Sequence, residues 1–394
     1  MNYNYFFVLG SNQALSIMEL MAVLKFSSTD FIVVENVLLL NSKTTINSPT
    51  LMKQLGGTIK IGLILKSLTK YDEVEIFKTF KNEIHPETIS GKFTFGFSVH
   101  GKKRDIHGLA MEIKKELRSQ EVSCRWVISK EPILSSVVVE QNNLTTRGIE
   151  FNIISDKETI FLGKTLTVQP FKELSFIDFG RPGRDDASGM LPPKLARIML
   201  NLGQIEPQQT ILDPFCGSGT MLTECLLQDC QDIIGSDISP RAIVDSQKNI
   251  DWVKKKFKPD FSGHINLFQS DSLELLKKLK PHSVDTIVTE PWLGPQRHKI
   301  APNQLRDLEK LYSDSIRVFS TLLKPGGRIV MIWPIFHINN KLHFINVNLA
   351  DFKLQLNLSN RLSANYQKQL SPRGNIIYGR SNQNVWREIV ILQK

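Results

Sequence analysis

The most informative stretch of this sequence reads Leu212-Asp213-Pro214-Phe215-Cys216-Gly217-Ser218-Gly219-Thr220. The apolar residues 210–212 predict a strand just before the glycines, and residues 221–227 predict a helix just after them. A strand that leads through a glycine turn into a helix places backbone N–H groups at the carboxyl edge of a sheet, where ligands bind in open α/β folds. Because Asp213 brings a carboxylate to this edge, the sequence favours a cationic or amine-bearing ligand over a pyrophosphate.

Three further predicted strands end in polar or glycine-containing loops. Residues 232–236 lead to Asp237, and an acidic residue about 20 positions beyond the glycines can bind the hydroxyls of a ribose. Residues 265–269 lead to Asp271, whose side chain is placed to reach an adenine amino group, and residues 284–289 lead to Glu290-Pro291-Trp292-Leu293-Gly294. The glycine turn lacks the third glycine of the dinucleotide fingerprint, so the predicted cofactor carries a nucleoside but is not a dinucleotide such as NAD.

This order of motifs resembles the S-adenosylmethionine-dependent methyltransferases that modify exocyclic amino groups of nucleic-acid bases. The resemblance implies an α/β fold, with a class I (Rossmann-like) methyltransferase domain built on a mixed seven-stranded sheet. It implies that Asp237 binds the ribose, that Asp271 binds the adenine, and that the methionine end of the cofactor is held by Asp213, Phe215, Gly217 and Gly219. Lys194, within Pro192-Pro193-Lys194-Leu195-Ala196, belongs to the remaining cofactor motif. Cys216 is interpreted as a small residue that fills the turn, since its thiol has no activating partner nearby in sequence.

The rest of the chain resembles more narrowly the tRNA guanine-N2 methyltransferases of the guanosine-10 type, which carry an amino-terminal THUMP domain. The motifs are Gly180-Arg181-Pro182-Gly183-Arg184-Asp185, Leu55-Gly56-Gly57-Thr58-Ile59-Lys60-Ile61-Gly62 and Leu162-Gly163-Lys164-Thr165. The resemblance implies a ferredoxin-like α+β domain over residues 1–80 and a THUMP α+β RNA-binding domain over residues 81–168. A linker over residues 169–190 and the methyltransferase domain over residues 191–394 complete the predicted organisation.

Within the predicted THUMP range, residues 93–99 alternate as in a strand and residues 109–117 predict a helix. Further strands are predicted over residues 125–128, 136–140 and 149–154. Arg181 and Arg184 in the linker, and Lys194 just after it, have two interpretations. They contact phosphate or order the cofactor pocket, or else they pair with Asp185 or Asp186.

The loop after the fourth strand carries the predicted catalytic residues. An arylamine is a poor nucleophile until acceptors aimed at its hydrogens hold the nitrogen towards sp³ geometry, and enzymes of this type place Asp or Asn, two prolines and an aromatic residue there. This chain has Thr289-Glu290-Pro291-Trp292-Leu293, which aligns in two ways. Either Glu290 is the acceptor and Leu293 takes the aromatic position, or Thr289 is the acceptor and Trp292 stacks on the base. We favour Glu290 as acceptor, with Pro291 and Trp292 lining the pocket.

Composition agrees with this assignment. The 394 residues carry a net charge of +10 and a pI of about 9.3, which favours a polyanionic partner through counterion release. No apolar run approaches the roughly 18 residues of a membrane span, so we expect a soluble protein. The four cysteines form no Cys-x-x-Cys pair, so neither a metal site nor a disulfide framework is expected. Because the amino terminus lacks the features of a secretion signal, we expect a cytoplasmic location.

The predicted function is therefore methyl transfer from S-adenosylmethionine to the exocyclic N2 of guanosine in tRNA, by a chain with no membrane association. Two alternatives remain open. The first is an amino methyltransferase that acts on rRNA or on adenine N6 of nucleic acid. The second is a non-catalytic RNA-binding relative with a degenerate catalytic loop at Glu290.

Overall fold

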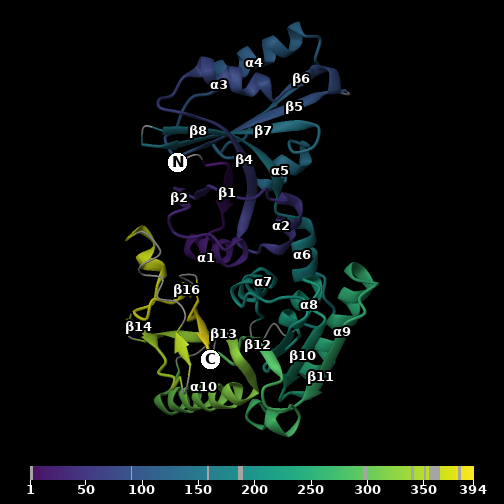
Figure 1. Ribbon diagram of the computed structural model, residues 1–394, viewed down its shortest axis with the longest axis vertical. Coiled ribbons are helices and arrows are strands. Elements are labelled where there is room, and N and C mark those ends of the chain that lie inside the picture. Colours follow the sequence, from purple (N-terminus) through teal and green to yellow (C-terminus); the bar gives the residue numbers. More distant parts are fainter. Residues whose placement is uncertain are drawn as a thin grey trace. The chain divides into compact units, whose positions relative to one another are not determined.

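A computed structural model describes residues 3–89, 91–157, 159–184, 190–295, 300–338, 341–349, 352–354, 364–379 and 383–394. The chain divides into two compact units (Figure 1). Unit 1 comprises Met1–Ile17 with Lys25–Lys172, and unit 2 comprises Met18–Leu24 with Glu173–Lys394.

The described part of unit 1 contains one eight-stranded sheet, in the order β2-β3-β1-β4-β8-β7-β5-β6 (Figure 1). Its strands are β1 (Tyr5–Leu9), β2 (Phe31–Val34), β3 (Val37–Leu40), β4 (Thr58–Leu68), β5 (Phe93–His100), β6 (Cys124–Val127), β7 (Gly148–Asp156) and β8 (Thr159–Val168). The helices in this part of the sequence are α1 (Gln13–Leu24), α2 (Ser48–Gln54), α3 (Glu73–Asn82), α4 (His107–Ser119) and α5 (Ser136–Gln141), with a 3₁₀ turn, η1, at Pro86–Thr88.

Aromatic side chains at alternating positions of β5 form the main core of unit 1. Phe95 and Phe97 pack against Phe80 of α3 and Phe151 of β7, with ring centroids 5.4 to 6.2 Å apart. Helix α3 begins where the Asp72 side chain accepts hydrogen bonds from two backbone N–H groups of its first turn. The strand predicted over 93–99 and the helix predicted over 109–117 are therefore confirmed as β5 and α4.

The strand predicted over residues 136–140 is wrong, because these residues form α5. The Ser135 hydroxyl accepts a hydrogen bond from the backbone N–H of Val138 and starts the helix. Three consecutive valines favour a strand only where a pleated surface is present for them to pack on. Here Val139 is buried against Val127, Leu134 and Leu144, so tertiary packing outweighs the β propensity.

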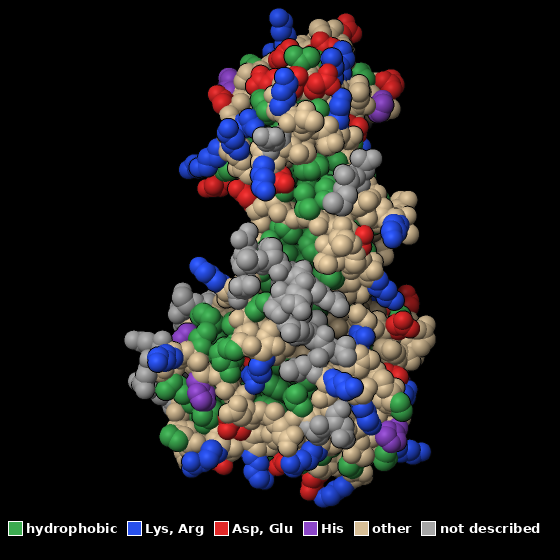
Figure 2. All heavy atoms as spheres, turned by 60° about the vertical axis from the view of Figure 1, so that its left-hand side comes forward, with side chains coloured by type: hydrophobic (Ala, Val, Ile, Leu, Met, Phe, Trp, Pro, Cys, Tyr) green, Lys and Arg blue, Asp and Glu red, His purple; other side chains and the backbone are tan. Residues whose placement is uncertain are grey.

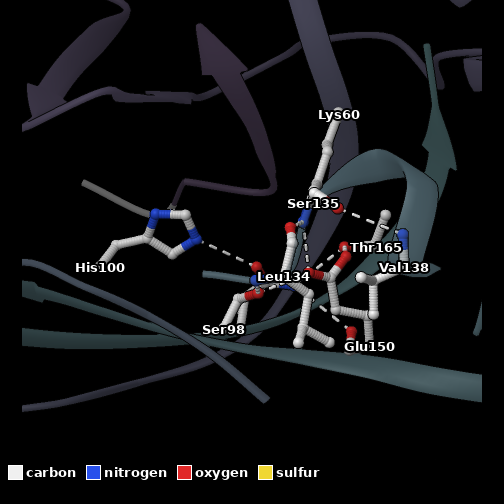
Figure 3. A network of polar contacts seen from close by, with 9 residues as sticks. Lys60, Ser98, His100, Leu134, Ser135, Val138, Glu150 and Thr165 are labelled. Atoms are coloured by element: carbon white, nitrogen blue, oxygen red, sulfur yellow. Dashed lines mark hydrogen bonds and ion pairs between the residues drawn. The ribbon is translucent and has the colours of Figure 1, made fainter. Parts of the chain in front are cut away.

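A buried polar network joins four strands of unit 1 (Figure 3). Lys60 of β4 forms an ion pair with Glu150 of β7, and both side chains are at most 1% exposed. The hydroxyls of Ser98 and Thr165 donate to the Glu150 carboxylate at 2.5 and 2.6 Å. Close to this network, burial lowers the pKa of His100 to about 4. Because Lys60 comes from the predicted ferredoxin-like range and Glu150 from the predicted THUMP range, the two ranges share one sheet and one buried network. The division at residue 80 stays a prediction.

Unit 2 contains, among its described residues, a mixed sheet of nine strands. Seven of them follow the order β11-β10-β9-β12-β13-β17-β15, and β14 and β16 pair with β13 and β17. The strands are β9 (Thr210–Asp213), β10 (Asp232–Asp237), β11 (His264–Gln269), β12 (Val284–Thr289), β13 (Leu323–Ile338), β14 (Lys341–Phe344), β15 (Lys353–Leu354), β16 (Ile376–Tyr378) and β17 (Val385–Gln393). The α/β class and the mixed sheet are as expected, and the two short strands extend the predicted seven.

The remaining elements of unit 2 are α6 (Phe171–Phe179), which begins at the end of unit 1, α7 (Pro193–Leu202), α8 (Thr220–Leu227), α9 (Pro240–Phe257) and α10 (Pro302–Leu322), with 3₁₀ turns at Ser272–Lys277 (η2) and Ala364–Gln369 (η4). Helix α6 lies inside the predicted linker 169–190, so that segment is partly helical. Residues 185–189, which include Asp185 and Asp186, lie outside the described residues.

The order of the strands indicates where in unit 2 a ligand would bind. Strands β9 to β12 pair in parallel, so their carboxyl ends lie at one edge of the sheet. The chain runs outward from β9 through β10 to β11 and then returns to β12 on the other side of β9. The strand order therefore reverses between β9 and β12, which is where ligands bind in open α/β sheets.

Candidate active site

A pocket of about 460 Å³ opens at this switch point. Its lining includes eight of the predicted site residues, which come from the ends of four strands: Asp213, Phe215, Gly217, Asp237, Asp271, Glu290, Pro291 and Trp292. Gly219 and Lys194 are not among the described lining residues. Sequence patterning missed other residues that line the pocket, among them Met190, Ser239, Arg241 and Asp245.

The glycine turn is held by helix α9. The Ser246 hydroxyl donates to the carbonyl of Gly217 at 2.8 Å, and the Asn249 amide donates to the carbonyl of Ser218 at 2.7 Å. Gly219 has φ +81°, and a Cβ there would lie 2.8 Å from the Ser246 oxygen. Gly217 has φ +51°, and a Cβ there would meet no described atom within 4 Å. Gly219 thus allows the turn to pack on α9, whereas Gly217 leaves open space at the pocket wall.

Asp213 lies at the end of β9 and is 4% exposed. Its carboxylate accepts hydrogen bonds from the Thr289 hydroxyl at 2.7 Å and from the Phe215 N–H at 3.2 Å. Burial raises the pKa of Asp213 to about 7, although both hydrogen bonds oppose this shift. A ligand with positive charge at this end of the pocket would stabilise the ionised carboxylate.

Asp237 and Asp271 hold the loops that form the pocket as well as lining it. Asp237 accepts from the Gly217 N–H at 3.0 Å and from the Ser239 N–H at 2.9 Å, which fixes the first loop against the second. Asp271 caps η2 by accepting from the Leu273 N–H at 2.9 Å. A carboxylate oxygen has two acceptor sites, so these backbone contacts leave acceptor capacity for ribose or adenine donors.

Side-chain exposure in the loop after β12 bears on which of its residues is the acceptor and which stacks on the base. Thr289 is fully buried and donates its hydroxyl to Asp213. Leu293 lines the pocket but is aliphatic and only 6% exposed. Trp292 is 54% exposed and lines the pocket, as does Glu290. The geometry therefore favours Glu290 as the acceptor in the pocket and Trp292 as the aromatic platform.

Two contacts fix this loop from other elements. The Tyr312 hydroxyl of α10 donates to the carbonyl of Trp292 at 3.1 Å. The Arg387 guanidinium of β17 donates to both oxygens of Glu290, at 2.6 and 3.4 Å. Neither contact was predicted, because Tyr312 and Arg387 belong to segments with no recognisable motif.

Of the basic residues upstream, Arg181 contacts a residue that lines the pocket. Arg181 is buried and donates to the hydroxyl of Thr220, the first residue of α8, and to Asp178 at 3.3 Å. This geometry favours an ordering role near the glycine turn for Arg181. Lys194 lies on the first turn of α7, outside the described lining. The described residues contain no group of His, Cys, Asp and Glu side chains placed to hold a metal ion.

Comparison with known proteins agrees with this geometry. Residues 181–342 match a family model described as an RMKL-like methyltransferase domain. The chain is 33% identical over 146 residues to a tRNA (guanine(10)-N2)-dimethyltransferase of Methanothermobacter thermautotrophicus, covering 37% of this chain and 39% of that protein. It is 27% identical over 177 residues to a tRNA (guanine(6)-N2)-methyltransferase of Thermus thermophilus, covering 44% and 47%. The matches thus span less than half the length of these two relatives.

Among solved structures, TrmN from Thermus thermophilus aligns over 100% of both chains with a TM-score of 0.53 and 16% identity. This similarity extends the fold relationship over both units, although the family model covers only part of unit 2. The pocket described above is built largely from residues inside the matched range. Residues 181–342 are therefore similar to the RMKL-like methyltransferase domain.

Proposed function

We propose that this protein transfers a methyl group from S-adenosylmethionine to the exocyclic N2 of guanosine in tRNA. The observation that supports this most strongly is the convergence of Asp213, Asp237, Asp271 and Glu290 on one pocket at the switch point of a methyltransferase domain. The guanine-N2 specificity rests on the names of the relatives, which act on guanine N2 at position 10 or 6 of tRNA.

The residues of the pocket fit this cofactor. The buried Asp213 carboxylate suits a ligand that carries positive charge, and Asp237 offers acceptors for the ribose hydroxyls. The open space beside Gly217 accommodates a ligand that passes close to the backbone. When bound, S-adenosylmethionine supplies a methyl group already activated by its sulfonium, so the chemistry calls for no metal.

The protein would orient the nucleophile. Glu290 accepts a hydrogen bond from the amino group of the target base, which draws the nitrogen lone pair out of conjugation with the ring. The exposed indole of Trp292 stacks on the base and holds it in the pocket. Extruding the base costs a few kcal/mol, and this stacking offsets part of that cost.

The RNA would also contact unit 1. The chain carries a net charge of +10, and Figure 2 shows Lys and Arg side chains over the surfaces of both units, with Asp and Glu among them. A hollow of about 360 Å³ in unit 1 is lined by Trp126 together with Lys103, Arg104 and Lys130. Aromatic and basic side chains together suit a single-stranded RNA end. We assign residues 81–168 the THUMP role of gripping the acceptor end of tRNA.

We propose a cytoplasmic location. The four cysteines are free and buried, as in proteins of a reducing compartment. No helix within the described ranges has the length and apolar character needed to cross a membrane.

The experiment is a transfer assay with radiolabelled S-adenosylmethionine and, in parallel reactions, unmodified tRNA or unmodified rRNA, followed by digestion of the product to nucleosides. Labelled N2-methylguanosine, or its dimethylated form, would support the proposal. Labelled N6-methyladenosine, or transfer to rRNA alone, would point to the alternative amino methyltransferases. Protein that binds the cofactor and tRNA without transferring label would point to a non-catalytic relative.

A further inference from the structure

The glutamate of the catalytic loop is held by an arginine far away in sequence. Arg387 Nε donates to Glu290 Oε1 at 2.6 Å, and Arg387 Nη2 donates to Oε2 at 3.4 Å. The two side chains are 9% and 10% exposed, so the pair is largely removed from water. Arg387 lies on β17, which is separated from β12 by β13. The Arg387 guanidinium on β17 therefore extends past β13 to the loop at the end of β12.

This contact fixes the orientation of the carboxylate as well as its charge. A guanidinium fork that engages both carboxylate oxygens restricts the side chain to one plane, which a single ammonium cannot do. Although burial alone would lower the pKa of Arg387, the nearby Glu290 charge raises it, so the guanidinium stays protonated. Without this partner, Glu290 would be a largely buried charge that has lost its ion-pair partner.

The ion pair leaves Glu290 able to accept further hydrogen bonds. An ionised carboxylate has about four acceptor sites, and the fork uses one on each oxygen. Glu290 also lines the pocket, so the remaining sites can receive an amino hydrogen of the base. The backbone beside it is fixed by the Tyr312 hydroxyl, which is fully buried and donates to the Trp292 carbonyl.

We infer that Arg387 is a positioning residue that makes the atypical glutamate a working acceptor. Glu is one methylene longer than the Asp that the resemblance leads one to expect at this position, and a misplacement of about 1 Å can reduce a rate by about 100-fold. The Arg387 fork holds the longer side chain in one conformation against the wall of the pocket. This inference rests on the proposed function.

Strand β17 supplies a matched control. Its next residue, Glu388, is fully buried and pairs with Arg373, whose guanidinium also donates to the Ile345 carbonyl. Neither Arg373 nor Glu388 is among the described residues that line the pocket. Arg373→Lys therefore alters a second guanidinium–carboxylate fork to β17, in which Glu388 is buried and Arg373 is 27% exposed, without altering the proposed acceptor.

The experiment compares full-length wild type with Arg387→Lys, Arg373→Lys, Glu290→Gln and the double variant Glu290→Gln/Arg387→Lys. Melting temperature and S-adenosylhomocysteine affinity report on folding and on the cofactor pocket. The kcat and KM for unmodified tRNA report on positioning. For Arg387→Lys we expect kcat to fall at least about tenfold, with KM and cofactor affinity within about twofold of wild type, because the lost fork orients Glu290, the proposed acceptor of the amino hydrogen. Arg373→Lys should keep its kcat.

The double variant separates positioning from a general loss of activity. Once Glu290 is replaced, Arg387→Lys should change kcat no further, because residues that act as one unit are not additive. Wild-type kcat in Arg387→Lys, an equal loss in Arg373→Lys, or additive losses in the double variant would overturn the inference while leaving the proposed function in place. A wild-type protein that transfers no methyl group would overturn the proposed function, and the inference with it.

Discussion

The hydroxyl of Thr289 donates a hydrogen bond of 2.7 Å to the carboxylate of Asp213. This contact joins the ends of β9 and β12, so it couples the Asp213 side of the pocket to the loop that carries Glu290 and Trp292. Both side chains are buried, and burial raises the pKa of Asp213 to about 7. The protonation state of Asp213 therefore changes close to neutral pH.

We predict that S-adenosylmethionine binds more tightly as pH rises from 6 to 8, because a cationic ligand favours the ionised Asp213. Below pH 7 the affinity should fall by up to about tenfold per pH unit. Isothermal titration calorimetry at several pH values measures this slope, and Asp213→Asn should flatten it. Thr289→Val removes a hydrogen-bond donor that lowers the pKa of Asp213, so in this variant the pH at which cofactor affinity changes should be higher. A wild-type affinity independent of pH would contradict the prediction.

The same pKa shift affects the stability of the protein without ligand. The folded state keeps the Asp213 proton up to about pH 7, whereas the unfolded chain releases it near 3.8. The folded state therefore binds more protons between these values, and this contribution to stability is lost as pH rises towards 7. Asp213→Asn should accordingly remove a destabilising contribution at pH 8, which chemical denaturation of the two proteins measures.

The two glycines of the turn should respond differently to alanine. Gly219→Ala combines a positive φ with a Cβ 2.8 Å from Ser246, so we expect lower stability and a loss of cofactor affinity. Gly217→Ala meets open space at φ +51° and should cost only about 1 kcal/mol of backbone strain. Melting curves of the two variants measure the difference. Equal destabilisation would show that Ser246 does not constrain the turn.

We predict that Trp292 contacts the RNA base and not the cofactor. Trp292→Ala removes an indole that is 54% exposed, so stability should change little. Loss of base stacking costs about 1–3 kcal/mol, which corresponds to a fall of roughly 5- to 150-fold in kcat/KM for tRNA. Trp292→Phe retains an aromatic face and should recover part of the rate. A large loss of S-adenosylhomocysteine affinity in Trp292→Ala would instead place this side chain at the cofactor.

The buried pair in unit 1 gives a stability prediction. Lys60→Met leaves the Glu150 charge buried without its cation and should cost about 3–5 kcal/mol of unfolding free energy. The exposed pair Lys66–Glu75, at 45% and 31% exposure, is the control, and Lys66→Met should cost less than about 1 kcal/mol. Denaturant titration measures both variants. The double variant Lys60→Met/Glu150→Gln should be more stable than Lys60→Met alone, since the unpaired charge is removed.

Short sequence patterns predicted the elements that depend on neighbouring residues in the chain. The strand, glycine turn and helix around Asp213 follow from hydrophobic periodicity, and parallel strand order then brings Asp237 and Asp271 to the same edge. The partners of these residues were not predictable in this way. Arg387 is 97 positions from Glu290, and Lys60 is 90 positions from Glu150. Such pairs depend on how strands assemble, and no short motif records them.

The short helix α5 and Lys194 show two further limits of sequence interpretation. Three consecutive valines carry a strand propensity that the Ser135 cap and local packing outweigh. Lys194 lies in a recognisable motif, but position in a motif does not specify which side chains line the pocket. Its predicted contact with the cofactor stays a prediction.

The most direct measurement is calorimetric titration of the full-length protein with S-adenosylhomocysteine, using two aspartates of β10. Asp237 lies at the carboxyl end of this strand in the pocket, and Asp232 lies at its amino end. We predict one binding site in wild type and wild-type affinity in Asp232→Asn. In Asp237→Asn the affinity should be about tenfold or more weaker, because a hydrogen bond to a charged group is worth about 1.5–3 kcal/mol. No heat of binding with wild type, or equal affinity in Asp237→Asn, would contradict a nucleoside cofactor in this pocket.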